Sequence, residues 1–128
     1  MAGAFSAFRD ALIEIGYWND TVLFTASDFG RTVIDNGDGT DHGWGGHHFV
    51  MGGAVQGGTI YGTLPQADSN SQEFTPSRGR LIPSVSIEQY ASTIGSWFGL
   101  TTSELDGIFP NLGNFNQRNL GFLGGSTT

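Results

Sequence analysis

A largely apolar run from Val22 to Ala26 restricts the possible folds of this chain more than any other feature. A strand that is apolar on both faces is typical of the centre of a parallel sheet that helices cover. Gly16 is placed to end a preceding helix, whose apolar residues recur at helical spacing: Phe5, Phe8, Leu12 and Ile15. Helix, turn and buried strand together predict an α/β fold, in which ligands bind beyond the carboxyl ends of the strands.

Glycine dominates the segment that follows the predicted strand. The chain has 21 glycines, and most of them fall between Gly30 and Gly62. We expect a glycine-rich loop over residues 35–46, followed by two short strands, 49–51 and 60–61, in a small β-hairpin. The polar stretch 64–79 contains two prolines and predicts an exposed loop.

Two further helices are predicted in the second half of the chain. Ser86 and Gln89 have the spacing of a capping box, and the helix that they open has an apolar side: Ile87, Tyr90, Ile94, Trp97 and Phe98. The segment 101–104 starts another short turn of helix. The tail is expected to pack as a loop through four apolar residues: Phe115, Leu120, Phe122 and Leu123.

The charge balance excludes several classes of partner. The net charge is −7, and all five basic residues are arginines. Nucleic acids and anionic membrane surfaces are not expected as partners, because both need a basic face. Arginine without lysine suits forked contacts to carboxylate, phosphate or sulfate. No apolar run approaches the roughly 20 residues of a membrane span, and the N-terminus lacks the pattern of a secretory signal.

Three potential metal ligands follow the predicted strand: Asp28, Asp41 and His42. Carboxylates and a neutral imidazole bind zinc, manganese and similar divalent ions, and glycines let a loop direct neighbouring side chains at one centre. Each residue alone also fits an ordinary role, as a turn or cap for the aspartates and a loop contact for the histidine. Together they predict a divalent metal site, and the segment 35–41 leaves an irregular calcium site open. The adjacent His47 and His48 would point to opposite faces of an extended backbone.

Three segments carry a family resemblance: TASDFGRT at 25–32, NGDGTDHGWGGHHFVMGGAVQGG at 36–58 and RGRLIP at 78–83. They resemble the C-terminal part of the bacterial domain-of-unknown-function family fifteen-oh-one. Members of that family are similar to the alkaline phosphatase and sulfatase superfamily, which uses one or two divalent metals to cleave a phosphate or sulfate ester. A frequent motif there is Ser-Asp-His-Gly, whereas this chain has Phe29 at the histidine position.

This resemblance implies a fold and a site. The fold would be the C-terminal portion of an alkaline-phosphatase-like three-layer α/β/α domain, and residues 1–128 would form a single domain that is a fragment of a larger one. Asp28, Asp41 and His42 would bind zinc, manganese or calcium, or orient its ligands. Arg31 would bind an anionic oxygen of the ester.

The resemblance also implies that the chain has little or no turnover alone. Its partner would be a small anionic ester or the missing N-terminal part of the same domain. Full-length relatives look exported, to the periplasm or outside the cell. The alternative is a non-catalytic module that binds a partner, or that forms a homo-oligomer through an exposed sheet edge.

Overall fold

The computed structural model describes residues 2–66 and 79–124. Within these ranges the chain is a mixed α/β structure, so the predicted class is confirmed at this coarse level. Its helices are α1 (Ala2–Glu14), α2 (Ile87–Trp97) and α3 (Thr102–Ile108), with the 3-10 helices η1 (Trp18–Asp20) and η2 (Leu112–Asn114). Its strands are β1 (Val22–Phe24), β2 (Gly30–Asp35), β3 (Thr40–Gly43) and β4 (Val50–Gly52).

β1 is the predicted apolar strand, but its surroundings differ from the prediction. It pairs antiparallel with β4, with Leu23 opposite Met51, in a two-stranded sheet. Gly52 permits this close pairing, since a Cβ there would lie 2.3 Å from the carbonyl oxygen of Thr21. Phe24 is 45% exposed, so the strand is not covered on both faces. The prediction of a central parallel strand is therefore wrong for the described residues, because a short apolar run fits an antiparallel pair equally well.

β2 and β3 form an antiparallel hairpin, whose turn and second strand lie in the segment 35–46 that was predicted to be a loop. Arg31 pairs with His42 and Asp35 pairs with Thr40, and the ladder is irregular between these two pairs. Gly37 and Gly39 have φ of 93° and 145° in the connecting turn, and the Asp35 carboxylate accepts a bond from the Gly37 amide at 2.9 Å. The glycines thus supply the turn of a hairpin rather than a continuous loop. The hairpin predicted over 49–61 is wrong, because 60–61 is not a strand.

The buried apolar core lies between α2, α3 and the C-terminal tail, residues 115–124. The core residues in the described part of the chain are Tyr90, Leu105, Leu112 and Phe122. Leu123 makes an antiparallel bridge to Val55, which draws the tail against the segment after β4. Packing of the tail through Phe122, which is 2% exposed, is therefore confirmed.

α2 begins with the predicted capping box but buries a different face. Ser86 and Gln89 cap it reciprocally. The buried residues of α2 are mostly polar, namely Gln89, Ser92 and Thr93 beside Tyr90. Ile87 and Phe98 are exposed, so the predicted apolar side is only partly buried. Helical spacing identified the helix correctly, but it did not show which face the rest of the chain would cover.

The buried polar face of α2 binds the backbone of the tail. Gln89 Nε2 donates to the carbonyl oxygen of Gln117 at 2.6 Å. Thr93 Oγ1 accepts from the Leu120 amide at 2.8 Å and donates to the Gln89 carbonyl at 2.8 Å. Buried polar side chains need such partners, and here the tail supplies them.

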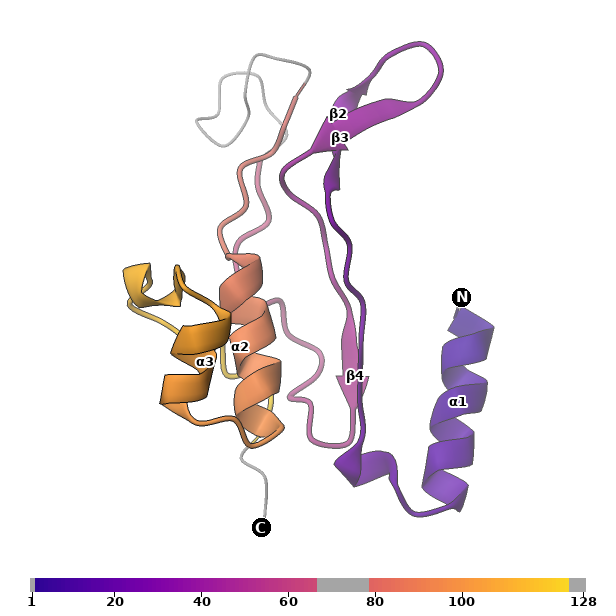
Figure 1. Ribbon diagram of the computed structural model, residues 1–128. Helices are drawn as coiled ribbons and strands as arrows, with labels where there is room; N and C mark the ends of the chain where they lie inside the picture. Colours follow the sequence, from indigo (N-terminus) through magenta and orange to yellow (C-terminus); the bar gives the residue numbers. More distant parts are fainter. Residues whose placement is uncertain (1, 67–78, 125–128) are drawn as a thin grey trace.

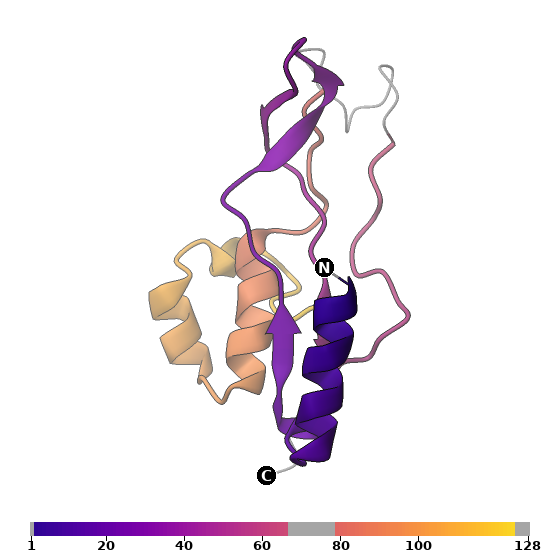
Figure 2. The ribbon, with the colours of Figure 1, turned by 90° about the vertical axis from the view of Figure 1, so that its right-hand side faces the viewer.

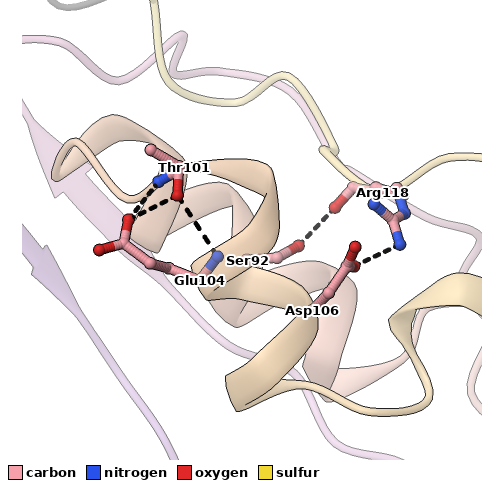
Figure 3. A network of polar contacts seen from close by, with 5 residues as sticks. All are labelled: Ser92, Thr101, Glu104, Asp106 and Arg118. Carbon is pink, nitrogen blue, oxygen red and sulfur yellow. Dashed lines mark hydrogen bonds and ion pairs between the residues drawn. The ribbon is translucent and has the colours of Figure 1, made fainter.

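Figure 3 shows that the tail also makes polar contacts with α3. Ser92 Oγ donates to the carbonyl oxygen of Arg118, and the Arg118 guanidinium pairs with Asp106 of α3 at 2.5 Å. Thr101 and Glu104 form the capping box at the start of α3. We call α2, α3 and the tail, with these polar contacts, the helical unit.

α1 lies away from the helical unit. Figures 1 and 2 place α2 and α3 on one side of the β1–β4 pair and α1 on the other, while the β2–β3 hairpin projects beyond both. α1 buries none of its residues. Gly16 ends this segment as predicted, with φ of 78°. No helix in the described ranges is long and apolar enough to cross a membrane.

Most of the predicted exposed loop over 64–79 lies outside the described residues.

Candidate functional site

Arg31 and His42, two of the predicted site residues, lie together on the β2–β3 hairpin. They are cross-strand partners, and partners in an antiparallel pair place their side chains on the same face. Phe29 stacks on the His42 imidazole, with ring centroids 3.5 Å apart and planes 13° apart. The Arg31 guanidinium carbon lies 5.1 Å from the centroid of the same phenyl ring. We call these three residues the hairpin stack.

The backbone of the hairpin fixes the stack. Arg31 Nη1 donates to the carbonyl oxygen of Thr40 at 2.7 Å. Gly30 lets residue 45 pass directly against β2, since a Cβ at Gly30 would lie 1.6 Å from the Gly45 carbonyl oxygen. Gly43, opposite Gly30, is also tightly enclosed, since a Cβ there would lie 3.0 Å from the Arg31 carbonyl. These glycines are therefore required for close packing and not only for flexibility.

The hairpin stack is open to solvent, because all three of its side chains are exposed. A guanidinium has five N–H donors in a planar fork, and one nitrogen here is engaged by Thr40. A stacked imidazole keeps its ring nitrogens at the edge of the ring, outside the stacking contact. The stack can therefore offer forked donors to an oxyanion and a ring nitrogen to a metal or a proton.

Asp41 occupies a different environment from His42. Successive side chains of a strand point to opposite faces, so β3 directs these two neighbours apart. The Asp41 carboxylate accepts from Asn36 Nδ2 at 2.6 Å, and its amide donates to Thr32 Oγ1 at 3.0 Å. Thr32 is buried, which ties Asp41 to the inner face of the hairpin.

Asp28 lies in the exposed connection between β1 and β2, directly before Phe29. Across residues 2–66 and 79–124, no group of three His, Asp or Glu side chains is arranged to hold a metal ion. The metal site predicted at Asp28, Asp41 and His42 therefore stays a prediction.

A second histidine cluster lies at the end of β1, and the sequence pattern did not single it out. His48 is half-buried and stacks on Tyr90, with ring centroids 5.3 Å apart. Its Nδ1 lies 3.4 Å from Thr25 Oγ1, which accepts the Phe49 amide at 2.9 Å. His47 is exposed, so these adjacent histidines differ in burial, in line with the predicted opposite orientation.

Tyr90 connects this cluster to the helical unit. Its hydroxyl donates to the Thr25 carbonyl oxygen at 3.1 Å, and its ring lies 5.6 Å from that of Phe122. Burial raises the pKa of Tyr90 from 10.0 to about 12, so the phenol keeps its donor further into alkaline pH than an exposed tyrosine would. The cluster therefore joins β1, the segment before β4, and α2. Thr25 and Tyr90 are 65 positions apart in the sequence, so no local sequence pattern indicated this cluster.

The chain belongs to a family whose members share sequence but have no assigned activity. The family described as Protein of unknown function (DUF1501) matches residues 1–108. This is the family that the motifs at 25–32, 36–58 and 78–83 predicted, and the match includes the whole hairpin stack. No curated protein and no solved structure is significantly similar to the chain.

Proposed function

We propose that this chain is the C-terminal part of a metal-dependent hydrolase-like domain that acts on a phosphate or sulfate ester. The hairpin stack is the observation that carries this proposal. Arg31 and His42 share one exposed face of the hairpin, where the guanidinium would bind an ester oxygen and the imidazole would bind a zinc, manganese or calcium ion. A bound divalent ion supplies Lewis-acid stabilisation of the transferring group.

Asp28 and Asp41 are proposed as further ligands or as groups that orient them. Asp41 is held by Asn36 on the other face of the hairpin from His42, which favours an orienting role for it. The remaining ligands would come from another part of the same domain. The complete domain would then have the three-layer α/β/α arrangement of alkaline phosphatases, with this chain as one portion of it.

The surface of the chain supports a polypeptide partner. Several large apolar side chains are exposed in the described residues, such as Ile15 on the segment after α1 and Trp44 after β3, each 63% exposed. Exposed apolar side chains of this kind are typical of surfaces that a partner covers. We infer that the N-terminal part of the domain covers such faces.

Metal binding by the purified chain tests the site. We expect weak binding of zinc or manganese in isothermal titration calorimetry, reduced at least about tenfold by His42→Ala. His47→Ala is the matched control, because His47 is an exposed histidine five residues further on. Equal metal affinities of the wild type and His42→Ala would show that His42 is not a metal ligand and would contradict the proposal.

Turnover tests the need for a partner. We expect no hydrolysis of aryl phosphates or aryl sulfates by the chain alone, with or without metal. Hydrolysis that persists through purification and disappears in His42→Ala would show instead that the chain is a complete enzyme.

The second candidate is a non-catalytic module that self-associates. Among the described residues each sheet has two strands, and exposed strand edges can pair with another copy. Sedimentation equilibrium separates the candidates. A stable dimer that forms without metal favours the module, whereas a monomer over the accessible concentration range favours the hydrolase portion.

A further inference from the structure

The strongest unassigned feature of the molecule is Phe29, which stands where the related motif has a histidine. Its ring has no polar atom and is still 38% exposed. It contacts two predicted site residues at once, His42 through a near-parallel stack and Arg31 through a cation–π contact. An exposed aromatic ring with two such contacts has a role that burial of apolar surface does not explain.

We propose that Phe29 is a positioning residue that fixes the ring plane of His42 and thereby the plane in which its ring-nitrogen lone pairs lie. An imidazole binds metals and exchanges protons through nitrogen lone pairs that lie in the ring plane. A stack with an interplanar angle of 13° covers a face of the imidazole and leaves the ring edge accessible. A quarter-turn of the imidazole about its Cβ–Cγ bond would break this contact, and a half-turn would restore it, so the stack restricts the ring to one plane.

The position of Phe29 is itself set by the hairpin. Arg31 Nη1 is bound to the carbonyl of Thr40, two positions before His42 on β3. The guanidinium is thus fixed to the strand that carries His42, and the phenyl ring contacts both side chains. Arg31 and His42 are also cross-strand partners. The β2–β3 ladder therefore holds both side chains that contact the Phe29 ring. A ligand of His42 would therefore meet a ring that is already oriented, at a smaller entropic cost.

This inference rests on the proposed function only in naming a divalent metal as the ligand of His42. The variants are Phe29→Leu, which removes the ring but keeps an apolar side chain, and Phe29→Tyr, which keeps the ring. Phe98→Leu is the matched control, because Phe98 is an exposed phenylalanine at the end of α2.

Two measurements on the full chain test it. In NMR spectra of the metal-free chain, the His42 ring protons should show an upfield ring-current shift, and the ring should be ordered in ¹³C relaxation. Phe29→Leu should lose both signatures, and Phe29→Tyr and Phe98→Leu should keep them. In zinc titrations, Phe29→Leu should bind about tenfold or more weakly, as expected when a residue that orients a ligand is removed.

The outcomes separate the two proposals. If wild type binds no zinc, the metal-dependent function fails, and the NMR comparison alone decides whether Phe29 positions His42. If Phe29→Leu keeps the ring-current shift and ring order of the wild type, the positioning role is overturned. If the shift is lost but zinc affinity is unchanged, the stack exists without positioning the ligand, and the inference is likewise overturned.

Discussion

The helical unit and the β2–β3 hairpin are stabilised in opposite ways. In the helical unit, polar side chains of α2 are buried and bind the backbone of the tail, as Thr93, 0% exposed, binds Leu120. In the hairpin, charged and aromatic side chains stack on one another in solvent. Buried hydrogen bonds fix a chain because leaving them unmade is costly, whereas an exposed aromatic or cation–π contact contributes about 0.5–1.5 kcal/mol. The comparison shows that burial fixes the helical unit, whereas contacts between neighbouring side chains fix the hairpin stack.

Gly30→Ala should disrupt the β2–β3 hairpin, and this is the largest effect expected. The new Cβ would lie 1.6 Å from the Gly45 carbonyl oxygen, so backbone must move. Overpacking of this kind costs about 3 kcal/mol or more. Hydrogen exchange should show lost protection of hairpin amides while α2 amides remain protected. Gly57→Ala is the control, since a Cβ there meets nothing within 4 Å. Loss of protection in both regions would show that they are one cooperative unit.

Thr93→Val tests the helical unit. Valine has the shape of threonine but leaves the Leu120 amide without its acceptor, at a cost of about 1–3 kcal/mol. Urea unfolding should report this loss, and tail amides should exchange faster. Ser96→Ala, on the exposed side of α2, should change stability by under about 0.5 kcal/mol. Equal stability of Thr93→Val and the wild type would mean that the tail does not depend on this bond.

The smallest effect is expected from the pH dependence of the α3 cap. Hydrogen bonds from the Thr101 hydroxyl and amide lower the pKa of Glu104 from its ordinary value of 4.5. A lowered folded-state pKa contributes stability above the unfolded value, and that contribution is lost as pH falls through the folded value. The stability of the wild type should therefore fall below about pH 4.5 by more than that of Glu104→Gln. Parallel curves for the two proteins, from urea unfolding between pH 3 and 6 (roughly the range in which carboxyl groups titrate), would contradict this.

Local chemistry made part of this fold predictable. The capping box at Ser86 and Gln89 identified the start of α2, and the positive φ at Gly16 ends the first helical segment as expected. Strand pairing was less predictable, because β1 pairs antiparallel with β4 and not with the parallel neighbours that were predicted. The segment 35–46 was predicted as loop because its glycines hide the strand pattern of β3, which follows the turn. For the candidate site, the sequence indicated Arg31 and His42 separately, but their cross-strand pairing came only from the register.

The amino-acid sequence by itself determined the family, the helices and their caps, because these depend on motifs and on contacts within a few residues. Only the tertiary structure decided which face of α2 is buried, that Thr25 meets Tyr90 across 65 positions, and that Phe29 covers His42. Asp41 and His42 are neighbours in sequence, yet the pleat of β3 sends them to opposite faces of the hairpin. The physical reason is that strand register and helix rotation are set by long-range packing, which short-range sequence patterns do not encode.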